Sequence, residues 1–218
     1  MTQSGCGSSK SDAPAVKVEE APVKAVPVPV APMDARQAIV AFGDSLTAGF
    51  GAEPGNSYPD FLQKELDRAG LAWRVVNFGV SGDTTTDGAN RVSEVLALKP
   101  RVVILEFGGN DGLRGLPIET TKANLEQMIV ELKKSGAAVI LAGMTLPPNY
   151  GPDYIRGFER VYQDLAVKYK LVRIPFLLEG VATDKSLMQR DGIHPTGAGN
   201  SKVAATVMRY LTPVLAGK

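Results

Sequence analysis

The sequence predicts an α/β protein in which helices cover both faces of a five-stranded parallel sheet, forming a three-layer α/β/α sandwich. From Gln37 onward, short apolar runs alternate with stretches of helical period, which is the pattern of successive βαβ units. The runs are continuously apolar, as in strands that are buried on both faces. With 218 residues, of which 44% are hydrophobic, the chain is long enough for one substantial domain.

Each expected strand is an apolar run that ends in a polar or glycine-rich turn. The runs are residues 38–42, 73–78, 101–107, 137–142 and 171–174. The first helix is expected to begin after Ser57, which is a good capping residue with Asp60 three positions on, and to end at Gly70. Later helices are indicated by apolar faces within residues 92–96, 125–132, 158–165 and 203–215.

Residues 1–36 differ in composition from the rest of the chain. They hold Pro14, Pro22, Pro27, Pro29 and Pro32, without helical or strand period, which is typical of a disordered tether. The domain is expected to span residues 37–218. Small residues before Cys6, followed by Gly, Ser and a proline-rich stretch, resemble the processed start of a bacterial lipoprotein. Either Cys6 is lipid-anchored in a periplasmic or envelope protein whose signal region is missing, or it is an ordinary thiol.

Charge and residue counts exclude several classes of function. Twenty-four basic and 23 acidic residues leave a net charge of +1, which does not favour nucleic acid as a partner. One cysteine rules out intrachain disulfides, and one cysteine with one histidine cannot build an ordinary zinc site. No apolar stretch is long enough for a transmembrane helix. A monomer or weak oligomer acting on a small molecule is expected.

A serine follows the first expected strand, at the place where open α/β sheets bind ligands. Ser45 comes directly after the run 38–42 and the pair Gly43-Asp44. A serine hydroxyl is a poor nucleophile until a base takes its proton, and His194 is the only histidine of the chain. Asp191 precedes it by three residues, a spacing at which a carboxylate can hold the imidazole tautomer. These residues therefore indicate a serine hydrolase.

Such a reaction also needs fixed donors for an oxyanion. The backbone N–H of Ser45, the backbone N–H of Gly82 and the side-chain amide of Asn110 are donors of suitable type. All three residues are expected on loops at the carboxyl edge of the sheet, together with Asp191 and His194. Loops at one edge can converge, so the five residues are expected to form one site.

These clusters are similar to the four sequence blocks of the GDSL or SGNH hydrolase family. The blocks occur in order at residues 43–46, 77–82, 108–111 and 191–194. Residues 81–85, 108–115, 146–151 and 191–195 more narrowly resemble the bacterial group of multifunctional acyl-CoA thioesterase I, lysophospholipase and arylesterase. The resemblance implies a flavodoxin-like sheet, no cofactor and an ester or thioester substrate. It also assigns the nucleophile, oxyanion donors, base and orienting acid to Ser45, Gly82 with Asn110, His194 and Asp191.

Each of these residues also has a purely structural interpretation. Ser45 could cap a helix, His194 could be an ordinary loop histidine, and Asn110 could sit in a turn. The joint occurrence of the four blocks favours the catalytic interpretation. Three aspartates near the blocks, Asp44, Asp83 and Asp111, are expected to support turns and loops rather than to act as catalytic acids. Arg114 and Tyr150 are candidates for substrate contact, because they lie on loops near the expected site.

Other functions stay open at this stage. Within the hydrolases, the same catalytic set serves carbohydrate acetyl-esterases. A flavodoxin-like ligand-binding module is a non-catalytic alternative, although neither a P-loop nor a complete dinucleotide fingerprint occurs. A degenerate hydrolase kept for interaction is disfavoured because all five functional positions are present.

Overall fold

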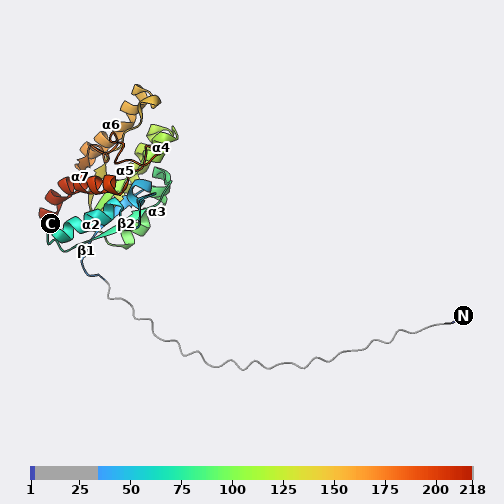
Figure 1. Cartoon of the computed structure of the whole chain (residues 1–218), viewed down its shortest axis with the longest axis horizontal. Coiled ribbons are helices and arrows are strands. Elements are labelled where there is room, and N and C mark those ends of the chain that lie inside the picture. Colours follow the sequence, from blue (N-terminus) through green and yellow to red (C-terminus); the bar gives the residue numbers. More distant parts are fainter. Residues whose placement is uncertain (3–33, 218) are drawn as a thin grey trace. The chain divides into compact units, whose positions relative to one another are not determined.

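The computed structural model describes residues 1–2 and 34–217, and Figure 1 shows the chain from end to end. Most of the predicted tether, including Cys6, lies outside these residues. The five strands are β1 (Gln37–Gly43), β2 (Trp73–Gly79), β3 (Val102–Glu106), β4 (Ala138–Ala142) and β5 (Val172–Ile174). They form one parallel sheet in the order β2-β1-β3-β4-β5. The predicted fold class is therefore confirmed.

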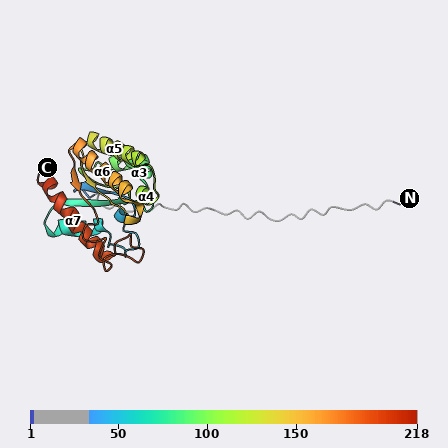
Figure 2. The ribbon, with the colours of Figure 1, turned by 90° about the horizontal axis from the view of Figure 1, so that it is seen from above.

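Helices cover both faces of this sheet, as Figure 2 shows from above. On one face α2 (Tyr58–Arg68) packs against α7 (Gly197–Ala216), and on the other α5 (Ile118–Lys134) packs between α3 (Thr85–Ala97) and α6 (Pro152–Tyr169). Strands β1 and β3 lie in the middle and are buried almost throughout. Burial on both faces is the physical reason for their continuous apolar runs.

Local signals explain where the longer helices begin. Ser57 caps α2 and Asp60 returns a hydrogen bond, so the predicted capping box is present. Thr84 and Asp87 form the same arrangement at α3. Two short helices, α1 (Ser45–Ala48) and α4 (Gly109–Leu113), follow β1 and β3, where turns were expected. A further turn of 3-10 helix, η1 (Pro148–Tyr150), lies in the loop after β4.

The strand order places a topological switch point between β1 and β3. The chain goes from β1 outward to β2 on one side, and then returns to β3 on the other side. Loops that leave neighbouring strands in opposite directions open a crevice at their carboxyl ends, where α/β proteins bind ligands. Ser45 leaves β1 at this crevice and Asn110 follows β3 beside it. None of the helices within residues 34–217 is both long and apolar enough to cross a bilayer.

Candidate active site

Ser45 is held at the start of α1 by the residue before it. Asp44 is the N-cap of this helix, and its Oδ1 accepts a hydrogen bond of 3.0 Å from the N–H of Leu46. This turn ends the strand at Gly43 and places Ser45 beyond the edge of the sheet, while the β1 backbone up to Gly43 stays paired with its neighbouring strands. The supporting role expected for Asp44 is therefore confirmed.

His194 lies between Ser45 and Asp191 and contacts both. Its Nε2 is 2.8 Å from the Ser45 Oγ, and its Nδ1 is 2.7 Å from the Asp191 Oδ2. The other carboxylate oxygen of Asp191 accepts the backbone N–H groups of Ile193 and His194 at 2.9 and 3.0 Å. Burial alone would raise the pKa of Asp191, but these hydrogen bonds outweigh it and lower the pKa to about 2. The carboxylate therefore stays ionised at neutral pH.

The loop that carries His194 is fastened from two directions. An antiparallel bridge pairs Met188 with Pro195, and the N–H of Gln189 donates to the carbonyl of His194 at 2.8 Å. The Gln189 side-chain amide donates to the carbonyls of Pro195 and Phe50. The ring of Phe50 lies on the imidazole of His194, with the ring centroids 4.6 Å apart. These contacts restrict the position of the imidazole.

The three expected oxyanion donors come from the residues that follow β1, β2 and β3. The N–H groups of Ser45 and Gly82 have no backbone acceptor among residues 34–217. Gly82 has a φ of +90°, which favours glycine because a side chain is strained there. The amide of Asn110 donates to the carbonyl of Asp83 at 2.9 Å and to the Oδ2 of Asp44 at 3.2 Å. The structure thus brings all three expected donors to one edge of the sheet.

Arg91 holds the Gly82 loop against the sheet. Its Nε lies 2.7 Å from the carboxylate of Asp83, and its other nitrogens donate to the carbonyls of Phe78 and Gly43. The pair is well shielded, with 13% and 14% of the two side chains exposed. Asp83 therefore positions both its own loop and, through its carbonyl, the amide of Asn110.

An apolar cleft of about 530 Å³ opens at Ser45 and His194. This volume lies within the range of small-molecule sites, roughly 300 to 1,000 Å³. Most of the wall is aliphatic, aromatic or proline side chains from the segments that follow β1, β3, β4 and β5: Leu46, Leu113, Met144, Leu146, Pro147, Pro148, Phe176, Leu178, Ala182, Met188 and Ile193. Such a wall can take up an apolar group without leaving buried polar atoms unpaired.

Known proteins resemble the chain over nearly all of this domain. A sequence profile of the GDSL-like Lipase/Acylhydrolase family matches residues 41–202. The chain belongs to this family. Esterase TesA of Pseudomonas aeruginosa is 42% identical over 182 residues, which are 83% of this chain and 90% of the relative. Thioesterase 1/protease 1/lysophospholipase L1 of Escherichia coli is 34% identical over 83% of this chain and 86% of its own length. The crystal structure of TesA, with 42% identity, superimposes with a TM-score of 0.79 and covers 81% of this chain and 99% of that one.

The predicted GDSL hydrolase is thus confirmed, and the structure shows where its sequence blocks lie. The blocks with Ser45 and Asn110 follow the central strands β1 and β3, and the block with Gly82 follows β2. The block with Asp191 and His194 lies between β5 and α7. Within the part of the chain that the structure describes, no group of three or more His, Cys, Asp or Glu side chains is arranged to hold a metal ion.

Arg114 and Tyr150 support loops of this GDSL domain and do not line its cleft. Arg114 donates to the carbonyl of Gly82 at 3.0 Å, and the hydroxyl of Tyr150 donates to the carbonyl of Leu113 at 2.8 Å. Arg114 therefore contacts the same loop that presents the Gly82 N–H. Substrate contact by these two residues stays a prediction.

Sequence reasoning missed three residues that the GDSL site uses. Phe50 and Gln189 lie in loops far apart in the chain, and no sequence pattern links them to His194. Glu106 ends β3, where a polar residue is ordinarily solvent-exposed, yet its side chain is fully buried next to Asp44. Burial raises the pKa of Asp44 to about 6, and burial together with the charge of Asp44 raises the pKa of Glu106 well above its usual range.

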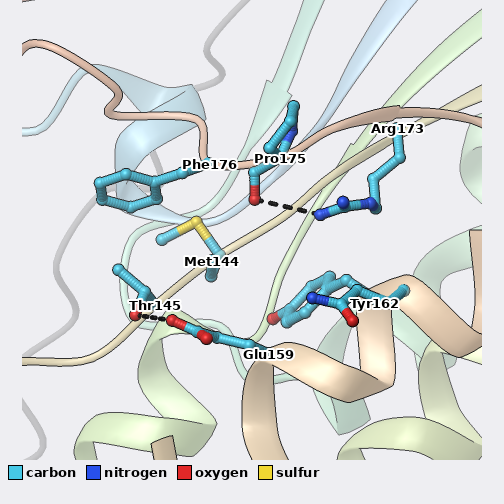
Figure 3. A pocket seen from close by; sticks show the side chains of 8 residues that line it. Met144, Thr145, Glu159, Tyr162, Arg173, Pro175 and Phe176 are labelled. Atoms are coloured by element: carbon cyan, nitrogen blue, oxygen red, sulfur yellow. Dashed lines mark hydrogen bonds between the residues drawn. The ribbon is translucent and has the colours of Figure 1, made fainter. Parts of the chain in front are cut away.

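A second hollow of about 310 Å³ lies behind the cleft and shares Met144, Thr145 and Phe176 with it. Figure 3 shows polar side chains beside Tyr162 and Pro175 in its other walls, where Thr145 donates a hydrogen bond to Glu159 and Arg173 donates one to the carbonyl of Pro175. Ser45 and His194 do not line this hollow. The apolar cleft is therefore the hollow that the reactive side chains face.

Proposed function

We propose that the chain hydrolyses carboxylic esters and thioesters through an acyl-enzyme on Ser45. The observation that carries this proposal is the pair of short hydrogen bonds that join His194 with Ser45 and with Asp191, at the mouth of an apolar cleft. The bond from Asp191 holds a proton on Nδ1 and leaves Nε2 free to accept the hydroxyl proton of Ser45. His194 is the base, and Asp191 orients it.

The reaction takes place in two halves. Ser45 Oγ attacks the substrate carbonyl carbon while Nε2 of His194 takes the hydroxyl proton, and the carbonyl oxygen becomes an oxyanion. When the tetrahedral intermediate collapses, the alcohol or thiol leaves with the proton from His194. Water then attacks the acyl-enzyme with His194 again as base, which releases the carboxylic acid and restores the Ser45 hydroxyl.

The oxyanion is bound by the N–H groups of Ser45 and Gly82 and by the amide of Asn110. Asn110 has two amide hydrogens, and in the free enzyme they are directed at Asp83 and Asp44. The bond to the Asp83 carbonyl is the shorter one and keeps the amide in place. The hydrogen directed at Asp44 is the one that an oxyanion shares, so both bonds continue to orient the amide.

The cleft favours short to medium acyl chains or aryl groups as substrates, because its wall is predominantly apolar. Relatives named as an esterase and as a thioesterase and lysophospholipase support the same substrate class. A carbohydrate ester would need hydrogen-bond partners for its hydroxyl groups, and this wall offers few. We therefore favour acyl esters and thioesters over acetylated sugars as the substrates.

The test is intact-mass detection of the acyl adduct together with a burst-phase assay on p-nitrophenyl butyrate. We expect the wild type to show the burst and an adduct on Ser45, and Ser45→Ala to show neither. Ser201→Ala is the matched control, because Ser201 is exposed on α7 and should leave both signals intact. Equal turnover by Ser45→Ala and the wild type would refute the covalent mechanism. Octanoyl-CoA and acetylated xylan, assayed in parallel, separate the two substrate classes.

An envelope location, with a lipid on Cys6, is the remaining part of the proposal and rests on the N-terminal sequence alone. Fractionation of bacteria that produce the chain behind a lipoprotein signal, compared with Cys6→Ser, tests it. Membrane association that depends on Cys6 is the expected result.

A further inference from the structure

Glu106 is a fully buried carboxyl group directly behind the nucleophile turn. It is paired in register with Gly43, the last residue of β1. Its Oε2 accepts the backbone N–H of Asp44 at 3.2 Å and the hydroxyl of Thr47 at 2.8 Å. A Cβ on Gly43 would collide with the Glu106 side chain, so the glycine allows this close approach. One oxygen of Glu106 therefore accepts hydrogen bonds from Asp44 and Thr47, on either side of Ser45, and so connects this turn to β3.

The other oxygen, Oε1, is equally buried and has no hydrogen-bond donor among the described residues. An ionised carboxylate oxygen left without a donor in the interior is costly, whereas a protonated carboxyl group is itself a donor. Asp44, whose N–H bonds the other oxygen of Glu106, is 2% exposed and brings a second buried carboxyl group to the same place. Burial raises the pKa of both groups, to about 6 for Asp44, and the charge of Asp44 raises that of Glu106 further.

No cation neutralises these two carboxyl groups within residues 34–217. Neither Asp44 nor Glu106 takes part in a salt bridge there. Arg91, from α3, is bonded to Asp83 and to backbone carbonyls instead. The other titratable side chains near the pair are Tyr58 from α2, Tyr162 from α6 and His194, and Asp111 lies beyond Tyr162 with its carboxylate bonded to Thr85 and Thr121. Two negative charges here would have no compensation.

We propose that Asp44 and Glu106 hold one proton between them, carried by Glu106, and that this pair positions Asn110. The proton on Glu106 Oε1 is donated to the Asp44 carboxylate. Asp44 then has three donors, namely Glu106, the N–H of Leu46 and the amide of Asn110. This arrangement keeps a single negative charge behind the oxyanion site. Glu106 is thus a positioning residue that acts through Asp44, and this role rests on the proposed function of Asn110.

Substitution of Glu106 tests this role in catalysis. Glu106→Gln replaces the shared proton with an amide donor and keeps an acceptor for Asp44 N–H and Thr47, so kcat should stay within about threefold of the wild type. Glu106→Met has similar volume and no donor, and its kcat should fall at least tenfold with KM unchanged. If Gln lowers kcat as much as Met does, a donor at this position does not matter and the proposal is wrong. An acyl adduct that still forms on Ser45 in both variants shows that the proposed reaction itself is intact.

The pH dependence of stability tests the proton directly and does not require activity. A proton held by folded Glu106 is released on unfolding at any pH above about 4.3, the usual value for glutamate. Its contribution to stability is fully present below that pH and is lost as pH rises toward the folded pKa. Relative to Glu106→Gln, the unfolding constant of the wild type should therefore rise with pH above about pH 5, by up to about tenfold per pH unit until the pH reaches the folded pKa of Glu106.

Urea unfolding of the two proteins at each pH measures this ratio. Glu159→Gln is the matched control, because Glu159 is only half-buried and bonds Thr145 outside the catalytic cluster. Its unfolding constant should follow that of the wild type across the same pH range. Parallel curves for the wild type and Glu106→Gln would show that Glu106 is ionised in the folded protein and would overturn the proposal.

Discussion

Asp191→Asn is a sharp test of the proposed base because the two oxygens of Asp191 have different roles. Oδ1 accepts two backbone N–H groups, and Oδ2 faces the imidazole Nδ1 of His194. In the variant, the carbonyl oxygen of the introduced amide can keep both backbone bonds, so the loop should retain its shape. The amide nitrogen would then face Nδ1 as a donor. His194 would carry its proton on Nε2, where it cannot accept the proton of Ser45.

The size of the effect follows from these hydrogen bonds. To react, the variant must place the proton on Nδ1, which removes a hydrogen bond to a charged group and leaves a donor unpaired. Together these cost about 3 to 6 kcal/mol, or a loss of roughly 10²- to 10⁴-fold in kcat. The Asp191 side chain is 37% exposed, so water can replace part of the lost interaction and the lower half of this range is expected.

Steady-state kinetics on p-nitrophenyl butyrate, with melting temperatures measured in parallel, check this expectation. Asp184→Asn is the matched control, since Asp184 accepts the N–H of Ser186 in a similar turn away from the cleft. Both variants should remain folded at the assay temperature, Asp191→Asn with a lower melting temperature than the wild type, and only Asp191→Asn should lose activity. A kcat within tenfold of the wild type for a folded Asp191→Asn would show that Asp191 does not set the tautomer of His194.

Three other outcomes are expected. Asn110→Ala should lower kcat by about 10²- to 10³-fold with little change in melting temperature, and near-normal turnover would remove Asn110 from the oxyanion site. Phe50→Ala should lower kcat about two- to tenfold, because an aromatic contact of this kind is worth about 0.5 to 1.5 kcal/mol, and an unchanged kcat would show that the stacking does not position His194. The ionised Asp191 contributes stability above about pH 3.9 that is lost as pH falls toward its folded pKa of about 2. In urea titrations from pH 4 to pH 2 the wild type should therefore lose stability more steeply than Asp191→Asn, and equal slopes would contradict the lowered pKa.

The sheet and its longer helices were predictable because their signals are local. Strand β3 is recognisable as a buried strand from its own residues, and the capping box at Ser57 and Asp60 marks the start of α2 without any tertiary information. The short helices α1 and α4 were not predictable. Four or five residues are too few for a 3.6-residue period, and their positions depend on caps and neighbouring loops.

The candidate functional residues were predictable from the sequence, but the contacts that hold their loops in place were not. Ser45, Gly82, Asn110 and the Asp191/His194 pair each sit in a recognisable short block, and parallel strands bring such blocks to one edge of the sheet. Arg114 and Tyr150 were expected near substrate because they lie on adjacent loops. Their hydrogen bonds to loop carbonyls depend on where those loops fold, which no local pattern encodes.

By itself, the sequence determined the α/β class and the hydrolase family, and it predicted the candidate residues of the site. These properties depend on periodicity and on short motifs, which are contained within a few neighbouring residues. Only the tertiary structure decided that Phe50 lies on His194, that the cleft is apolar and that Glu106 is buried beside Asp44. Burial and pairing depend on contacts between residues far apart in the chain, so the ionisation of a carboxyl group such as that of Glu106 is set by the fold.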